Sequence, residues 1–159
     1  MAAEEARGRD EFPKVDQLQL RSMLIHHFRA DEPLCILSMP GVGKSQIVAQ
    51  ASQEVFGCLP HVLIGSVMQP SDYMGWAWMD AERKVMTYYP LDGSLFPAKA
   101  PGCLFLDELS SAPMMNQSAA LQLMDRSRRA GSSYCPPGVG RVAAGNRVGD
   151  RAGAGRLIS

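Results

Sequence analysis

The stretch SMPGVGKS, Ser38–Ser45, follows a short apolar run and precedes an amphipathic segment, and it decides the expected fold. It fits the pattern GxxxxGK[ST], in which backbone N–H groups converge on phosphate, the lysine contacts the β and γ phosphates, and the hydroxyl contacts magnesium. Ser38 stands where the pattern has its first glycine. The residues that approach the anion are kept: Gly41, Gly43, Lys44 and Ser45. A working loop is therefore expected if Ser38 tolerates its backbone angles.

Amphipathic helices are predicted on both sides of this loop. The upstream helix is expected to end around Asp31–Pro33, because the residue before a proline is biased away from helix. The downstream helix is expected to end at Gly57. The apolar residues assigned to these helices are Leu18, Leu24, Ile25 and Phe28 upstream, and Ile47, Val48, Ala51 and Val55 downstream.

Strands are predicted at 34–38, 61–67, 102–109 and 141–146, and the continuous apolar run before Asp107 is typical of a parallel strand that is buried on both faces. Pro113 is expected to open another helix, with Ser111 as its cap. Strands that alternate with helices in this way predict a three-layer α/β fold with a mainly parallel sheet.

Residues 75–99 depart from this alternation and predict a β-hairpin insertion followed by a loop. Trp76, Trp78, Tyr88 and Tyr89 in this segment have two interpretations. They are a stacking platform for bases or a polypeptide, or they are packing residues, and packing is favoured because that is the commoner role of hairpin aromatics.

Composition limits the function classes. The 159 residues, 46% of them hydrophobic, are enough for one domain with a core, and 16 basic residues balance 16 acidic ones. No overall basic field would attract nucleic acid or anionic lipid. A charged N-terminus and the lack of a long apolar run predict a soluble, cytoplasmic protein with no membrane partner. The four cysteines form no CxxC pair, which disfavours disulfide and zinc roles.

Two further motifs place polar groups at strand ends. LFLDEL, Leu104–Leu109, brings Asp107 and Glu108 to the edge of the sheet where ligands bind in doubly wound folds. There Asp107 suits a magnesium shell and Glu108 suits an attacking water, although an acidic pair can also cap the next helix. Asn146 ends the strand AAGN, where its amide can hydrogen-bond γ-phosphate and water, or can simply form a turn.

The chain resembles the AAA+ ATPases, and within them the MoxR-like and dynein-related branch. The resemblance covers residues 15 to the end, after a frayed segment 1–14, and implies the P-loop NTPase version of the three-layer fold. LSMPGVGKSQIV resembles the Walker A motif, LFLDELSSAPMMNQSAALQLMDR resembles Walker B with its helix, and RVAAGNRVGDRAGAGRL resembles sensor 1 with its flank. SDYMGWAW resembles the segment before the inserted hairpin in that branch.

The resemblance implies ATP and Mg²⁺ as ligands and hydrolysis in line at the γ-phosphate. Lys44 and Ser45 would hold phosphates and Mg²⁺, Asp107 would order the Mg²⁺ shell, Glu108 would polarise the water and Asn146 would position it. Binding roles in the loop fall to Pro40, Gly41, Val42, Gly43, Lys44, Ser45 and Gln46. The preference for ATP over GTP rests on the family.

Members of this family form rings with an arginine finger and carry a helical lid, which a chain ending at Ser159 is expected to lack. Remodelling or maturation of a client, or of a partner with a von Willebrand A-type domain, is implied. One alternative is a fragment that acts as an interaction module without hydrolysis. Another is a nucleic-acid-directed motor, suggested by the hairpin aromatics and by seven arginines from Arg126 onward against one acid, although a solvated basic face is favoured and nucleic acid is not the expected partner.

Overall fold

The computed structural model describes residues 13–89 and 101–147. Parts of three predictions lie outside these ranges: the frayed N-terminus up to residue 12, the loop that follows the hairpin, and the arginines after residue 147.

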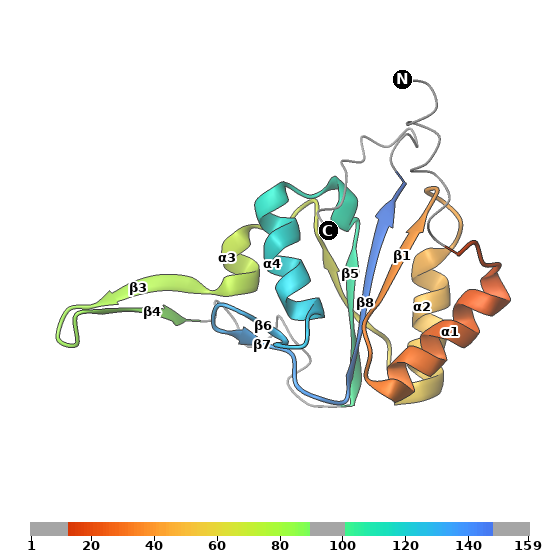
Figure 1. Cartoon of the computed structure of the whole chain (residues 1–159), viewed down its shortest axis with the longest axis horizontal. Helices are drawn as coiled ribbons and strands as arrows, with labels where there is room; N and C mark the ends of the chain where they lie inside the picture. Colours follow the sequence, from red (N-terminus) through yellow and green to blue (C-terminus); the bar gives the residue numbers. More distant parts are fainter. Residues whose placement is uncertain (1–12, 90–100, 148–159) are drawn as a thin grey trace, which may run out of the picture.

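A parallel sheet of four strands, in the order β1-β8-β5-β2, forms the centre of the molecule (Figure 1). Helices α1 and α2 cover one face and α4 covers the other, which gives three layers. This confirms the predicted α/β fold with a mainly parallel sheet. The strands are β1 (Leu34–Ser38), β2 (His61–Ile64), β5 (Gly102–Asp107) and β8 (Val139–Asn146).

Capping residues and residues with a left-handed φ set the ends of the helices α1 and α2. Helix α1 (Gln17–Ala30) starts with a capping box between Asp16 and Gln19 and ends at Asp31, whose φ of 59° is left-handed. Helix α2 (Lys44–Phe56) ends at Gly57, which also has a left-handed φ. The apolar face of the predicted amphipathic helix is buried at Leu24 and Phe28, whereas Leu18 near its start is 76% exposed.

Short helices connect the remaining strands. Helix α3 (Pro70–Met74) precedes the hairpin, and the 3-10 helix η1 (Leu109–Ser111) precedes α4 (Met114–Met124). Ser111 is the last residue of η1, and the residue before α4 is Pro113, which makes no side-chain cap. The prediction that Ser111 caps α4 is therefore wrong.

Each face of the sheet carries its own core. Along β5, Cys103 and Phe105 pack on the side of α1 and α2, whereas Leu104 and Leu106 pack on the side of α4. This alternation is the period-two pattern of a strand whose two faces are both covered. Strand β5 is buried along its length and ends at Asp107, which therefore lies at the carboxyl edge of the sheet.

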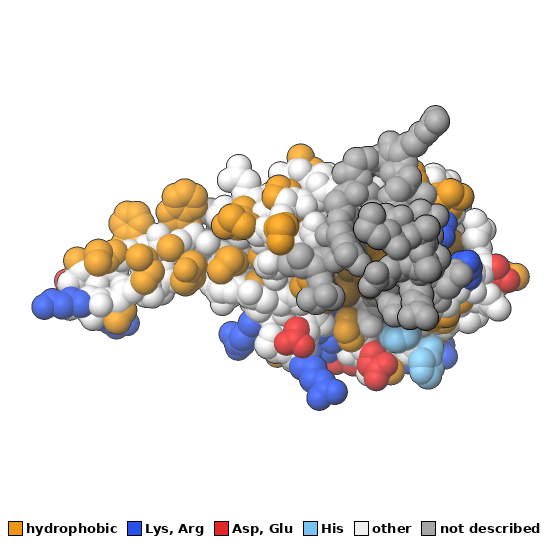
Figure 2. Space-filling model, turned by 45° about the horizontal axis from the view of Figure 1, so that its top comes forward, with side chains coloured by type: hydrophobic (Ala, Val, Ile, Leu, Met, Phe, Trp, Pro, Cys, Tyr) orange, Lys and Arg blue, Asp and Glu red, His pale blue; other side chains and the backbone are white. Residues whose placement is uncertain are grey.

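The predicted hairpin is confirmed and projects away from the sheet (Figure 1). Strands β3 (Trp76–Asp80) and β4 (Val85–Tyr89) pair antiparallel, with Trp76 opposite Tyr89. Figure 2 shows hydrophobic side chains along this arm and basic ones at its tip. Trp76, Trp78, Tyr88 and Tyr89 are 57%, 63%, 44% and 54% exposed. This exposure limits the predicted packing of these aromatic residues, among the described part of the chain, to the cross-strand pair of Trp76 and Tyr89.

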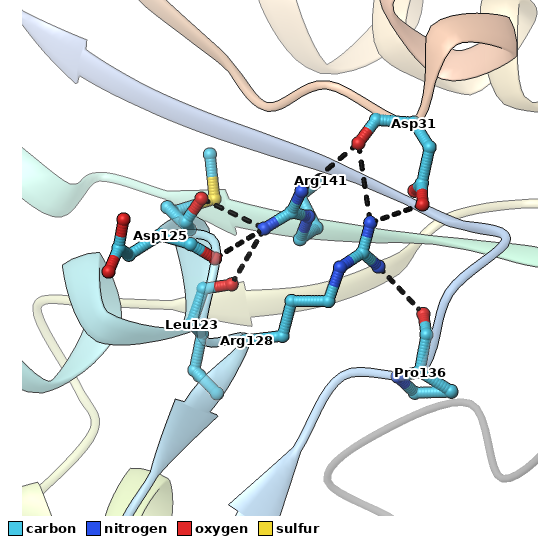
Figure 3. Close-up of polar contacts among 7 residues, drawn as sticks. Asp31, Leu123, Asp125, Arg128, Pro136 and Arg141 are labelled. Atoms are coloured by element: carbon cyan, nitrogen blue, oxygen red, sulfur yellow. Dashed lines mark hydrogen bonds and ion pairs between the residues drawn. The ribbon is translucent and has the colours of Figure 1, made fainter.

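Two arginines join the other end of the sheet to its helices (Figure 3). Arg141 on β8 is 3% exposed, and its Nη1 donates to the carbonyls of the last turn of α4, with Asp125 O at 2.8 Å. Arg128 donates to Pro136 O at 2.9 Å and forms an ion pair with Asp31. Both guanidinium groups also donate to the carbonyl oxygen of Asp31. The expected solvated basic face is therefore wrong for these two arginines.

Strands β6 (Arg129–Ala130) and β7 (Ser133–Tyr134) form a small antiparallel pair at the base of the hairpin. Gly131 in their turn has φ +58°, and Ser132 N donates to Met74 O at 2.8 Å. In residues 13–89 and 101–147, no helix has the length and apolar character to cross a membrane.

Candidate functional site

The predicted phosphate-binding loop connects β1 to α2 at the carboxyl edge of the sheet. Gly41 and Gly43 have φ of 79° and 82°, a left-handed conformation that glycine adopts without steric cost. Ser38, which departs from the glycine pattern, is the last residue of β1 and pairs with Asn146 on β8. Its backbone is in strand conformation, so a side chain at this position causes no strain.

Helix α2 presents its N-terminus to the loop. The N–H groups of a first helical turn have no intrahelical partner, and together with the helix dipole they attract anions. Pro40, Gly41, Val42 and Gln46 are exposed around this end of the helix. Gln17 of α1 donates from Nε2 to Val42 O at 3.2 Å, which ties the loop to the neighbouring helix.

Lys44 lies at the centre of the site. Its Nζ donates to Ser38 Oγ at 3.0 Å, to Met39 O at 3.3 Å and to Asn146 Oδ1 at 3.2 Å. The ammonium group is thus held between the end of β1 and the end of β8. The hydroxyl of Ser38 is a partner that the glycine of the general pattern would lack.

The carboxylates lie on the other side of the loop. Ser45 donates from Oγ to Asp107 Oδ2 at 2.9 Å, which joins the first turn of α2 to the end of β5. Glu108 follows with a left-handed φ of 54°, a conformation that is strained for a non-glycine residue. Its Oε2 accepts a hydrogen bond from Ser66 Oγ at 2.6 Å. The turn after β5 therefore separates the two neighbouring carboxylates, one toward α2 and one toward the end of β2.

The residues present suit a nucleotide with magnesium. A hydroxyl and a carboxylate oxygen 2.9 Å apart are hard oxygen donors of the kind that Mg²⁺ prefers. An ammonium group and a helix N-terminus stand beside them, and the region around Gly41 is open, with nothing within 4 Å of an added Cβ. A triphosphate needs this combination of donors and space.

The structure brings all the predicted site residues to one edge of the sheet, from Pro40–Gln46 to Asp107, Glu108 and Asn146. Two nearby serines were not predicted. Ser66 contacts Glu108, and Ser110 accepts a hydrogen bond from Asn146 N at 2.7 Å. The sequence could have indicated these serines only by their position, since Ser66 lies two residues after β2 and Ser110 lies two residues after Glu108. Isolated serines carry no motif, however, and nothing in their spacing distinguishes them from solvated ones.

Neither models of known protein families nor curated proteins match this sequence. Among solved structures, the chain is similar to a candidate ATPase from Cytophaga hutchinsonii, with a TM-score of 0.54 and 17% sequence identity. The similarity covers 89% of this chain but only 42% of that protein. At this identity the match concerns the fold. Together with the strand order and the loop between β1 and α2, it shows that the chain has a P-loop NTPase-like fold.

Proposed function

We propose that the chain is an ATP-binding, Mg²⁺-dependent ATPase domain of the MoxR-like AAA+ type. The observation that carries the proposal is the pair of contacts Lys44–Asn146 and Ser45–Asp107, which join the ends of β8 and β5 to one helix N-terminus. The similarity to a candidate ATPase supports the same class. Because this chain spans less than half of that protein, the assembly into a ring and the remodelling of a client protein are part of the proposal.

Each residue has a distinct role in this proposal. Lys44 and the N–H groups at the start of α2 bind the phosphates, and Ser45 and Asp107 hold the metal ion. Glu108 polarises the attacking water, and Asn146 orients it toward the γ-phosphate. Mg²⁺, when bound, would neutralise negative charge that develops on the phosphate oxygens.

A second candidate is nucleotide binding without turnover, as an interaction module. The contact between Ser66 Oγ and Glu108 Oε2, at 2.6 Å, favours it, because it engages the carboxylate that hydrolysis requires. A nucleic-acid-directed motor has less support, since Arg128 and Arg141 are committed to backbone carbonyls. The exposed hairpin aromatics are the remaining observation in its favour.

Hydrolysis of ATP with and without Mg²⁺, measured over a range of protein concentrations, tests the proposal. Wild-type turnover is expected, and Glu108→Gln should lower kcat by at least about 100-fold while retaining ATP binding. Glu82→Gln, an exposed acid in the hairpin turn, is the matched control and should change neither value. Binding without turnover at any concentration would favour the second candidate, and no binding would reject both.

A further inference from the structure

The backbone N–H of Asn146 has an unusual partner for a strand residue. Strand β8 lies between β1 and β5, but its pairing with β5 ends at Ala143, whereas its pairing with β1 continues to Asn146. On the β5 side, the last residues of β8 have therefore lost their neighbouring strand. The N–H of Asn146 donates instead to Ser110 Oγ at 2.7 Å. A side-chain hydroxyl thus takes the place of a strand carbonyl.

Ser110 has little freedom to move. It is 1% exposed, and it packs directly against β8 at Gly145, where an added Cβ would lie 2.9 Å from the Cβ of Ser110. Only a glycine at position 145 allows η1 to approach this closely. The hydroxyl is therefore held at one place beside the end of β8.

The same serine connects two parts of the candidate site. It lies two residues after Glu108, in the 3-10 helix that follows the carboxylates. Through the N–H of Asn146 it fixes the residue whose Oδ1 contacts Lys44 Nζ at 3.2 Å. Among the described contacts, Nδ2 of Asn146 has no partner and remains available as a donor.

We infer that Ser110 is a positioning residue, which acts by holding the backbone of Asn146 so that its amide faces the reacting phosphate and water. The inference rests on the proposed ATPase function. Without the hydroxyl, the end of β8 would keep only its β1 partner, and the Asn146 amide would sample orientations that do not favour hydrolysis.

A buried serine that only stabilises the fold would behave differently, and a double-mutant cycle separates the two roles. The variants are Ser110→Ala, Asn146→Ala and the double variant, with Ser111→Ala as the matched control. Ser111 lies in the same 3-10 helix and is half-buried, and no described contact involves its hydroxyl. The measurements are hydrogen exchange at the Asn146 N–H without nucleotide, and kcat and KM for ATP.

Ser110→Ala is expected to speed exchange at the Asn146 N–H by about tenfold and to lower kcat by about tenfold, with KM within about twofold of wild type. In the Asn146→Ala background, the same substitution should lower kcat by less than about twofold. Ser111→Ala should leave all three values within about twofold.

Equal losses of kcat in both backgrounds would overturn the positioning role, because the effect would not pass through Asn146. Unchanged exchange at the Asn146 N–H would overturn it as well. An absence of wild-type turnover would contradict the proposed function instead. Exchange would then still decide whether Ser110 holds Asn146.

Discussion

Lys44 and Asn146 are 102 residues apart in the sequence, and their side chains meet with 3.2 Å between Nζ and Oδ1. The contact joins the first residue of α2 to the last residue of β8. It places a fixed positive charge beside a neutral amide, at the end of the sheet where the carboxylates also lie. The first prediction follows from this arrangement.

Lys44→Met should weaken ATP binding by about 10- to 100-fold, because hydrogen bonds from a charged donor to phosphate are lost. Titration calorimetry measures the change in Kd. Lys84→Met removes the same charge from the exposed hairpin turn and should leave the Kd unchanged. Equal affinities for wild type and Lys44→Met would show that nucleotide does not bind at this loop.

Arg141→Met should lower the free energy of unfolding by about 2 to 4 kcal/mol, because it leaves carbonyl oxygens at the end of α4 without donors. Urea unfolding measures this loss. Arg129→Met is the control, since Arg129 is exposed and stacks over Tyr134 at 4.5 Å, and it should cost less than about 1 kcal/mol. Similar losses for the two variants would contradict the structural role of Arg141.

Stability should fall as the pH rises above about 9. Burial raises the pKa of Cys103 to about 12 and that of Cys135 to about 11, from an ordinary value of 9.0. Between these values the unfolded chain loses protons that the folded chain keeps, so the free energy of unfolding decreases with increasing pH. Each thiol should contribute a loss on the order of 1 kcal/mol by pH 10.

Urea unfolding at pH 8, 9 and 10 measures this decrease. Cys135→Ala should remove one thiol's share of the slope, whereas Cys35→Ala on the exposed edge strand should leave more of it in place. A stability that stays level from pH 8 to pH 10 would show that these thiols ionise in the folded protein.

Gly131→Ala should destabilise the protein more than Gly57→Ala does. Both glycines have left-handed φ, +58° and +69°, so each alanine incurs a conformational cost of about 1 kcal/mol. At Gly131 the added Cβ would also lie 2.2 Å from Met74 O, whereas at Gly57 nothing lies within 4 Å. Unfolding free energies compare the two variants, and equal losses would mean that the turn does not pack against α3 as described.

The two tryptophans of the chain, Trp76 and Trp78, should emit as water-exposed indoles and should be quenched readily by acrylamide. We expect this because both indole rings are more than half exposed on the hairpin. Fluorescence of the wild type and of Trp78→Phe distinguishes the two contributions. Emission shifted to short wavelength, with slow quenching, would show that another layer covers the arm in solution.

The sequence predicted the central elements because their signals are local and strong. The apolar run before Asp107 has one stable position in a covered sheet, and the strand ends then bring Asp107 and Asn146 to the same edge as the loop. Leu18 was grouped with Leu24 among the apolar residues of the first helix, but it lies six residues away. At about 100° per residue these two side chains point about 120° apart around the helix.

The remaining contacts depend on tertiary neighbours that no spacing reveals. A count of charges treats Arg141 as solvated, yet it lies within a buried strand, beside helix carbonyls that need donors. Nothing in the sequence distinguishes Ser66 and Ser110 from other serines. They gain their hydrogen-bond partners only when the ends of β2, β5 and β8 come together. The hairpin aromatics matched a packing pattern, but packing requires a second layer that the sequence does not specify.

The double attachment of Arg128 and Arg141 to the carbonyl oxygen of Asp31 gives the two ends of the sheet different mechanical character. Each guanidinium group makes several hydrogen bonds to backbone carbonyls there, so this end is the more rigid pivot of the two. At the opposite end, the Lys44 ammonium makes three hydrogen bonds, and the side chains of Ser45 and Glu108 make one each. An incoming triphosphate with its metal ion could replace these bonds one by one. Any rearrangement on binding should therefore increase in amplitude along β8, from Arg141 toward Asn146.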